Sequence, residues 1–422
     1  IILYATGGLE LIERRSQIST LIILFALCLG WTILYADRTA LYPLLSVIGE
    51  DYKLSSTMMG TVTSSYFLVY VSMQIPSGIL ADKLGNKRLL ILTFIIAGTA
   101  LLGFGLLAKS YLMLIFFTAL HGFGAGSYYP CAYGIMLNTV DSKRWGLAAA
   151  IVNLGMSFGL IIGLAVSGPL YLRFNSYSGI FIGLGLLTMM AALVFYIIIP
   201  NVKNAGANGS GTAKSFPLVG ILKNKNILLI NSAQFCALYG YWTAVTWGAT
   251  FFQEERGVSM ELAGLFVAIV GISSLVPSVL MGRISDKFGR KKIALVLFPL
   301  GAITIFMMAY VHSNIAIILS LIAYGIFGKS SWDPIAIAWA GSHARAMDKD
   351  ALGTAMGAFN FTGMMSAVVA PVVTGFIRDI TGSFVAAYYV AALISVLGGI
   401  LVMFVSEEPE IFGNANAIES GV

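Results

Sequence analysis

Long apolar stretches, separated by short polar turns, follow one another along almost the whole chain. Twelve of them have the length, about 20 residues, that a helix needs to cross the hydrocarbon core of a bilayer. They are residues 18–46, 58–80, 89–108, 111–140, 145–172, 179–199, 227–252, 262–280, 293–311, 315–340, 352–376 and 384–405. This pattern predicts an all-α membrane protein with twelve transmembrane helices.

A polar segment divides these stretches into two sets of six. Residues 201–226 are rich in Gly, Asn and Lys, which is the composition of a linker. We therefore predict an N-terminal six-helix half (1–200), a cytoplasmic linker (201–226), a C-terminal six-helix half (227–406) and a cytoplasmic tail (407–422).

Composition and charge support a place in the membrane. Of the 422 residues, 58% are apolar and 10% are charged, whereas soluble domains carry about 25% charged residues. Of the 25 Lys and Arg residues, eighteen fall in the N-terminal segment and every second loop after it. Because cytoplasmic loops carry the excess of cations, we expect a multi-pass protein of the plasma or inner membrane with both termini in the cytoplasm. The net charge of +6 then belongs to these loops and indicates no nucleic-acid partner.

The sequence offers little for redox or enzymatic chemistry. Cys28, Cys131 and Cys236 lie in apolar stretches, where cysteine behaves as a small buried hydrophobe. The sequence shows neither a cluster of metal ligands nor a nucleophile motif. We expect no enzyme, no cofactor and no metal.

One short motif occurs at the same place in each half, between the second and third stretches. Its first copy consists of Gly78, Asp82 and Gly85, followed by Arg88, and its second of Gly282, Asp286 and Gly289, each 204 residues later, followed by Arg290. Glycine lets helices approach closely, and the acidic residue can pair with a cation or a helix N-terminus. The duplicated motif resembles the signature loop of the major facilitator superfamily, whose members are secondary transporters of six plus six helices. The resemblance implies a gating role for these residues.

Four charged residues fall inside the apolar stretches: Asp37, Arg38, Lys329 and Asp333. Each costs about 2.5–3.5 kcal/mol at the centre of a span, and such residues usually have a function. Asp37 and Arg38 are neighbours, about 100° apart on a helix, so each needs a partner on another helix or in a water-filled cavity. Lys329 and Asp333 are one turn apart and can pair on one helix face. Such a pair either stiffens its helix or contacts a substrate.

Polar side chains at helical spacing are further candidates for lining a cavity. They are Tyr66, Tyr70 and Gln74 in the second stretch, Asn231, Gln234 and Tyr241 in the seventh, and Asn360 in the eleventh. Such residues either join neighbouring helices through hydrogen bonds or line a binding cavity. His121 in the fourth stretch is more typical of a packed or hydrogen-bonded residue than of a proton relay.

A narrower resemblance covers most of both halves. It rests on Tyr35-Ala36-Asp37-Arg38, Tyr70 with Gln74-Ile75-Pro76, Gln253 to Gly257 with Ser259, Phe327-Gly328-Lys329, and Pro371 with Gly375 to Phe384. These residues resemble the anion:cation symporter branch of the superfamily, which includes proton-coupled transporters of sugar acids, phthalate and sialic acid. The resemblance implies that Asp37 is a protonation site, that Arg38 and Tyr70 contribute to substrate binding, and that Gln234 and Asn360 contact polar groups of the substrate. The branch usually has an arginine and a glutamate in the fourth span, where this chain has Thr118 and Ala125.

We predict a secondary active transporter, a proton-coupled symporter of a small organic anion, in which two halves rock around a central site. With both aspartates ionised, the four membrane charges sum to zero. A proton on Asp37 leaves +1, which favours a carboxylate near Arg38 and Lys329. Tyr241 and Asp333 complete the predicted substrate site. The expected partners are the anion, protons and the lipid bilayer, and we expect a monomer.

Two other functions stay open from the sequence. A drug/proton antiporter typically carries a Gly-Pro pair followed by a Gly-Gly pair in the fifth span. Here that span has Gly155, Gly159 and Gly163 at a spacing of four, and Gly168-Pro169 only at its outer end. A transporter-like membrane sensor needs a cytoplasmic contact surface, yet the longest polar gap is the linker-like segment 201–226.

Overall fold

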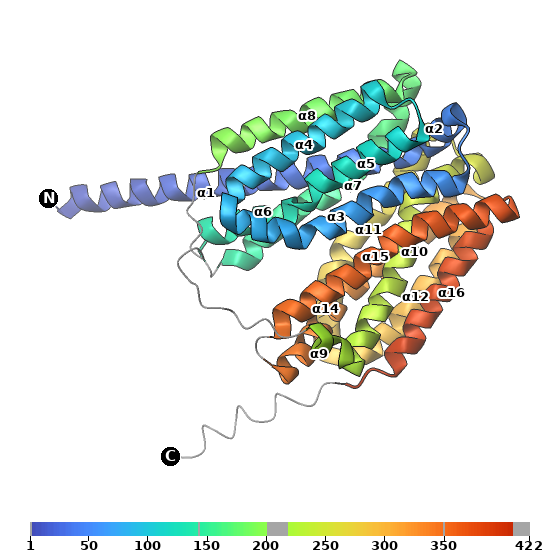
Figure 1. The fold of residues 1–422 in the computed structure, drawn as a ribbon. Coiled ribbons are helices and arrows are strands. Elements are labelled where there is room, and N and C mark those ends of the chain that lie inside the picture. Colours follow the sequence, from blue (N-terminus) through green and yellow to red (C-terminus); the bar gives the residue numbers. More distant parts are fainter. Residues whose placement is uncertain (1, 142–143, 201–217, 349–350, 408–422) are drawn as a thin grey trace, which may run out of the picture. The chain divides into compact units, whose positions relative to one another are not determined.

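The computed structural model describes residues 2–141, 144–200, 218–348 and 351–407, with side chains from residue 20 onward. Within these ranges the chain forms helices and no strand (Figure 1), so the predicted all-α class is confirmed. In chain order the helices are α1 (Ile2–Thr39), the 3₁₀ turn η1 (Tyr42–Leu44), α2 (Leu45–Tyr52), α3 (Ser56–Leu84), α4 (Asn86–Leu107), α5 (Tyr111–Gly126), α6 (Tyr128–Thr139), α7 (Trp145–Phe174), α8 (Tyr177–Ile198), α9 (Leu218–Lys223), α10 (Lys225–Arg256), α11 (Met260–Phe288), α12 (Arg290–Tyr310), α13 (Asn314–Phe327), α14 (Lys329–Met347), α15 (Ala351–Thr381) and α16 (Val385–Met403).

The first apolar stretch predicted to cross the membrane, 18–46, extends from α1 through η1 into the start of α2, and each of the others coincides with one helix or with two consecutive helices. In the described part of the chain, nine helical segments are long and apolar enough to span a bilayer. The α5 and α6 helices are short, with 16 and 12 residues, and α3 and α10 carry many Ser, Thr, Tyr and amide side chains. Length and composition of the helices therefore do not confirm the predicted count of twelve spans.

Some of the predicted organisation lies outside the described residues. This applies to residues 201–217 of the predicted linker, to the tail from residue 408 onward, and to the loop cations Lys143, Lys203, Lys214 and Lys349. Residues 218–226 of the predicted linker form α9 and begin α10.

Residue contacts gather the chain into two compact units. The first consists of Ile1–Gly211, Val245–Gly271 and Pro371–Ile380, and the second of Thr212–Ala244, Ile272–Ala370 and Thr381–Val422. The first unit thus joins the first six predicted spans to one end each of α10, α11 and α15. The boundaries of the two six-helix halves stay a prediction.

Helix breaks place the four membrane charges near helix ends. The α1 helix ends at Thr39, and Pro43 follows in η1, where its ring fixes φ and removes a backbone donor. Asp37 and Arg38 therefore lie in the last turn of α1. In the tenth predicted stretch, α13 ends at Phe327 and Gly328 separates it from α14. Lys329 and Asp333 consequently occupy the start of α14.

In the first unit, α1 packs along α7 through three glycines that stand one turn apart. A Cβ atom at any of them would collide with a backbone carbonyl of α1. The contacts pair Gly155 with Cys28, Gly159 with Thr32 and Gly163 with Ala36. This close approach fixes the turn of α1 that carries Asp37 and Arg38.

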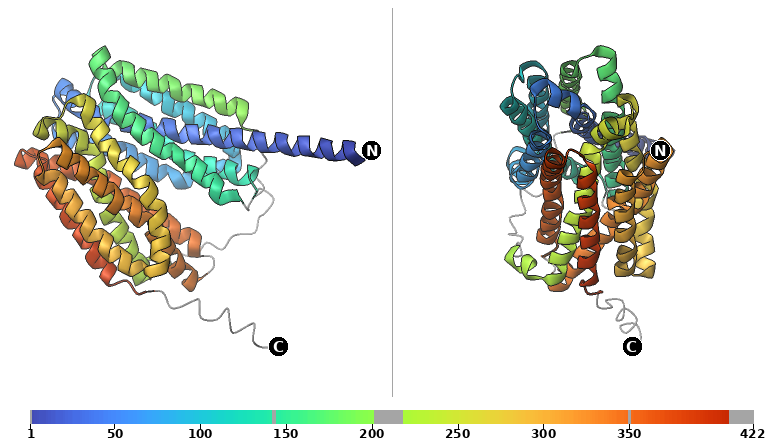
Figure 2. Two further views of the ribbon diagram at one scale, coloured as in Figure 1. Left: turned by 180° about the vertical axis from the view of Figure 1, so that it is seen from behind. Right: turned by 90° about the vertical axis from the view of Figure 1, so that its right-hand side faces the viewer.

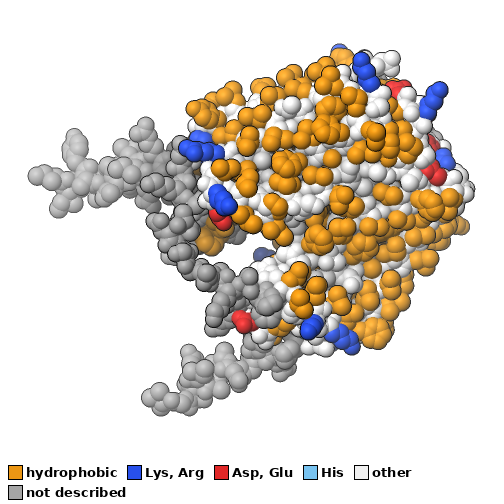
Figure 3. Space-filling view, in the orientation of Figure 1, with side chains coloured by type: hydrophobic (Ala, Val, Ile, Leu, Met, Phe, Trp, Pro, Cys, Tyr) orange, Lys and Arg blue, Asp and Glu red, His pale blue; other side chains and the backbone are white. Residues whose placement is uncertain are grey.

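Other helix pairs complete each unit. In the first unit α4 lies beside α8, and in the second α12 lies beside α16 (Figures 1 and 2). The core of the second unit gathers around Phe298, Trp332 and Trp339, all of which are buried. On the face shown in Figure 3, hydrophobic side chains cover most of the helices, and charged side chains gather toward helix ends. This distribution is expected of helices that face lipid.

The end of α15 that belongs to the first unit packs on the start of α3. Asp379 accepts hydrogen bonds from the backbone N–H groups of Ser56 (2.8 Å) and Thr57 (2.9 Å) and from the Thr57 hydroxyl (2.5 Å). An anion is favoured there because the first N–H groups of a helix lack intrahelical partners. The preceding residue, Arg378, pairs with Glu254 of α10 at 3.3 Å. Polar contacts thus tie three helix ends together.

Candidate functional site

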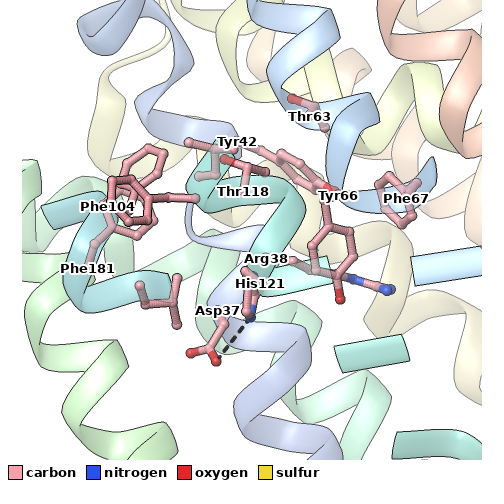
Figure 4. A pocket seen from close by; sticks show the side chains of 13 residues that line it. Asp37, Arg38, Tyr42, Thr63, Tyr66, Phe67, Phe104, Thr118, His121 and Phe181 are labelled. Atoms are coloured by element: carbon pink, nitrogen blue, oxygen red, sulfur yellow. Dashed lines mark ion pairs between the residues drawn. The ribbon is translucent and has the colours of Figure 1, made fainter. Parts of the chain in front are cut away.

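Asp37 is enclosed near the end of α1, with 1% of its surface exposed. Its Oδ2 atom lies 2.7 Å from the hydroxyl of Thr188 on α8 and 3.6 Å from Nε2 of His121 on α5. Figure 4 shows Asp37 and His121 pointing at each other. Among the described residues, the other carboxyl oxygen, Oδ1, has no hydrogen-bond partner. A charge in so dry a place is costly unless it is paired, and His121 is the group that can pair with it.

A small cavity of about 30 Å³ adjoins Asp37 and His121. Its lining is mainly apolar and includes Phe117 of α5. Phe104 of α4 and Phe181 of α8 also line it (Figure 4). This volume accommodates about one or two water molecules and is too small for a sugar acid. The cavity therefore suits water and protons rather than a larger transported molecule.

Arg38 extends away from Asp37, past Tyr66 and toward Phe67 (Figure 4). Its guanidinium carbon lies 3.6 Å from the centre of the Tyr35 ring and 5.4 Å from that of Phe67, distances typical of cation–π attraction. Tyr66 and Tyr70 of α3 stack nearby, with 5.7 Å between their ring centres. A guanidinium held among aromatic rings has the planar shape that binds a carboxylate through two parallel hydrogen bonds.

In the second unit, Lys329 and Asp333 form the ion pair that their spacing predicts. The distance from Nζ to Oδ2 is 2.6 Å, and the side chains are 25% and 24% exposed. Gln234 of α10 donates from Nε2 to the other oxygen of Asp333 at 2.9 Å. The ring centre of Tyr241 lies 5.3 Å from the Lys329 Nζ. The structure therefore brings together four of the predicted substrate-binding residues.

Asn360, the other candidate of this unit, lies on α15 and is exposed. Gly363 follows one turn later, and a Cβ atom there would lie 3.0 Å from the Gln234 Cγ. Asn360 is thus one turn away from the place where α15 packs against Gln234.

The duplicated motif forms the turns between α3 and α4 and between α11 and α12. Gly78 and Gly282 lie inside α3 and α11. Gly85 and Gly289 end these helices with φ angles of 88° and 97°. Glycine adopts this conformation without the steric penalty of a Cβ atom, so the second glycine of each copy is needed for the turn itself.

The charged residues of the two copies have different surroundings. Arg290 lies 3.6 Å from Asp286 and donates to the hydroxyl of Ser342 on α14 at 2.8 Å. Asp82 and Arg88 of the first copy are exposed. The second motif is thus anchored to a neighbouring helix of its own unit, and the gating role of both copies stays a prediction.

The sequence interpretation missed the contacts of Asp37. It took His121 for a packed or hydrogen-bonded residue without naming a partner and gave Thr188 no role, and in the structure both side chains lie next to the carboxylate. Each is a polar residue in an otherwise apolar stretch, which is the signal that could have found it. The pairing itself depends on contact between α1, α5 and α8 in the folded unit, and no local sequence pattern predicts which helices come into contact.

Comparison with known proteins assigns the chain to a family. A family model described as Major Facilitator Superfamily matches residues 27–371 and 278–419. The chain belongs to this superfamily. It is therefore a membrane transporter and not an enzyme, as the duplicated motif and the apolar stretches predict.

Several similar proteins are named as transporters of acidic compounds. A probable galactarate/D-glucarate transporter of Bacillus subtilis is 25% identical over 89% of this chain and 90% of the relative. The hexuronate transporter of the same organism is 25% identical, with 90% and 93% covered. A probable sulfoacetate transporter of Cupriavidus necator is 26% identical, with 91% and 93% covered. These relatives agree with the resemblance to the sugar-acid branch.

Solved structures share the fold. A bacterial homologue of the human lysosomal transporter Spinster, inward-facing and unoccupied, superimposes with a TM-score of 0.75 at 16% identity and covers 92% of this chain and 95% of its own. A variant of the nucleoside transporter NupG gives a TM-score of 0.76 at 16% identity, with 91% and 100% covered. At this identity the likeness concerns the fold alone.

Proposed function

We propose that this chain moves a small organic anion together with protons by alternating access. One observation carries the proposal. Asp37 and Arg38 are consecutive and buried, yet their side chains have separate neighbours: His121 and Thr188 for the carboxylate, and aromatic rings for the guanidinium. One turn of α1 thus holds a group that can gain a proton next to a cation that can bind an anion.

The balance of charges supports coupling between the proton and the anion. While the turn of α1 carries an ionised Asp37, its charge cancels that of Arg38. When that region gains a proton, the positive charge of Arg38 is no longer compensated, which favours a bound carboxylate or sulfonate. By reciprocity, a bound anion favours uptake of the proton. The Lys329–Asp333 pair is neutral in both states.

The chemical class of the substrate follows from the cation and from the relatives. Galactarate, glucarate, hexuronates and sulfoacetate, named for the relatives, all carry an acid group that a guanidinium binds with two parallel hydrogen bonds. We assign Arg38 and Tyr70 of the first unit to the acid group. The contacts assigned to the second unit are Gln234, Tyr241, Lys329, Asp333 and Asn360.

The proposal also includes the setting in the cell. The excess of cations in alternate loops supports a place in the plasma or inner membrane with both termini in the cytoplasm, and we propose that the protein acts there as a monomer. The two motif turns, at Gly85 and Gly289, then lie on the cytoplasmic side and act as gates.

The test uses purified protein in liposomes that enclose a pH-sensitive dye. D-glucarate, galactarate, galacturonate and sulfoacetate are added one at a time, and cationic drugs form a second series. Symport predicts acidification of the lumen on addition of at least one acid, and no change in liposomes without protein. If none of the acids acidifies the lumen and cationic drugs drive protons out of it instead, the protein is a drug/proton antiporter and not a symporter.

A further inference from the structure

We propose that Asp37 and His121 hold the transported proton together, and that the new N–H bond forms at Nε2 of His121. This inference rests on the proposed symport and names the second member of its proton site. It gives His121 a role in proton transfer, whereas the sequence alone favours a packed or hydrogen-bonded residue.

The geometry of the pair favours a shared proton. Nε2 of His121 lies 3.6 Å from Oδ2 of Asp37, and the side chains are 4% and 0% exposed. This distance exceeds that of a hydrogen bond, about 2.7–3.2 Å. Within the described part of the chain, His121 Nε2 and Asp37 Oδ1 have no hydrogen-bond partner. A proton on Nε2 faces a carboxylate and turns two poorly satisfied groups into a charge-assisted pair.

The surroundings offer the pair no other group that changes charge near neutral pH. Of the described residues, the charged and titratable ones around it are Arg38 of α1, Tyr35 and Tyr42 of α1 and η1, and Tyr66 and Tyr70 of α3. The adjoining cavity is lined from α4 and α8 by Leu101, Phe104 and Phe181. The Thr188 hydroxyl of α8 donates a hydrogen bond to Oδ2 of Asp37. Tyrosine and arginine ordinarily keep one charge state between pH 5 and 8, whereas histidine does not. The change in charge therefore falls to the imidazole and the carboxylate.

The proton step balances without any further reactant. The cavity next to the pair accommodates about one or two waters. A hydronium ion there gives its proton to the lone pair of Nε2 and stays behind as water; release is the reverse step. The pair changes from −1 to an internally neutral ion pair, and Arg38 then supplies an uncompensated positive charge for the anion.

The transport test compares His121→Gln with a matched control. Glutamine keeps a polar atom near the position of Nε2 but takes up no proton, and His312→Gln makes the same substitution at an exposed histidine outside this site. Uptake of radiolabelled D-glucarate into liposomes is measured at external pH 5 to 8, and exchange is measured at equal pH on both sides. Uptake by the wild type and by His312→Gln should rise about tenfold as the external pH falls from 8 to 5. Uptake by His121→Gln should vary by no more than about twofold, because this variant has lost the group that titrates there, and its exchange should be weaker but measurable, because Asp37 then stays ionised beside Arg38.

Two results separate the failure of this inference from the failure of symport. If His121→Gln keeps the pH dependence of the wild type, His121 carries no proton and symport still stands. If the wild type takes up D-glucarate with no pH dependence, proton symport fails and the shared site fails with it.

A second measurement depends neither on the substrate nor on one variant. The chain has three histidines, His121, His312 and His343, and ¹⁵N-histidine spectra are assigned with His312→Gln and His343→Gln. We expect the ¹⁵N chemical shifts of the His121 imidazole to report a change of protonation state between pH 5 and 8. The midpoint of this titration should shift in Asp37→Asn. A His121 that keeps one protonation state throughout, or that titrates identically without the carboxylate, would overturn the proposal.

Discussion

Two pairs of acidic and basic side chains lie in the apolar stretches and differ in almost every physical respect. Asp37 and His121 come from two helices, are closed to solvent and lie 3.6 Å apart. Lys329 and Asp333 stand one turn apart on a single helix, keep about a quarter of their surface exposed and lie 2.6 Å apart. Gln234 adds a hydrogen bond to Asp333. The first pair is therefore poorly satisfied and the second is satisfied locally.

This contrast predicts a division of labour between the two pairs. An exposed pair at a spacing of four contributes only about 0.3–0.5 kcal/mol, whereas loss of one partner of a buried pair costs about 3–5 kcal/mol. Lysine and aspartate keep their charges near neutral pH, but histidine does not. We therefore expect Asp37 and His121 to respond to protons, and Lys329 and Asp333 to offer a fixed polar surface to the substrate.

The largest effect is expected when matching changes are made in the two pairs. Asp37→Asn imitates a permanently protonated carboxyl and should lower anion accumulation driven by a pH gradient by about tenfold or more, while exchange persists. Asp333→Asn should leave the accumulation ratio unchanged. Both variants are measured by uptake of labelled anion with and without a pH gradient. Full accumulation by Asp37→Asn would show that Asp37 does not couple protons to the anion, and the two pairs would then not differ in their response to protons.

The next effect concerns binding rather than coupling. Arg38→Ala should weaken the apparent affinity for the anion by about 10- to 100-fold, since a hydrogen bond to a charged group contributes about 1.5–3 kcal/mol. Arg38→Lys keeps the charge but loses the planar fork, so it should recover only part of the affinity. The concentration dependence of exchange provides the measurement. Unchanged affinity in Arg38→Ala would show that Arg38 does not bind the acid group, and Lys329 would then be the candidate cation.

Smaller effects are expected when the Lys329–Asp333 pair is changed. Lys329→Met and Asp333→Asn should each change the apparent affinity by about two- to fivefold, on the scale of an exposed ion pair. The double variant should transport no worse than the poorer single variant, because it leaves neither charge unpaired. The apparent affinity of each of the three variants is measured from the concentration dependence of exchange. A loss confined to Lys329→Met and to the double variant would remove Asp333 from the proposed substrate contacts and leave Lys329 among them.

The smallest effect lies outside both pairs, at the end of α15. Asp379→Asn removes the negative charge from the start of α3 and should destabilise the protein by about 0.3–1 kcal/mol. Thermal unfolding of purified protein measures this change, and uptake at several pH values should show coupling intact. Loss of proton coupling in this variant would extend the coupling machinery beyond Asp37 and His121.

The sequence predicted the features that depend on local chemistry. The apolar stretches predicted the helices, and the spacing of Lys329 and Asp333 predicted their ion pair. The duplicated motif indicated the superfamily to which the chain belongs. Each of these signals lies within a few residues of one helix or one turn.

The sequence did not predict features that depend on several helices meeting. The contacts of His121 and Thr188 with Asp37 join α1, α5 and α8, which are far apart along the chain. The cap that Asp379 forms on α3 joins residues more than 300 positions apart. The breaks at Ser127 and Gly328 divide two predicted spans into helix pairs, because apolar composition alone does not mark where a helix stops.

The most direct test of the central claim is the ratio of protons to anions that enter the same liposomes. Dye acidification and labelled anion uptake are recorded together for wild type, Asp37→Asn and Asp333→Asn. The account predicts one fixed, non-zero ratio for wild type and Asp333→Asn, and anion exchange without proton uptake for Asp37→Asn. An unchanged ratio in Asp37→Asn, or a ratio lost in Asp333→Asn alone, would contradict it.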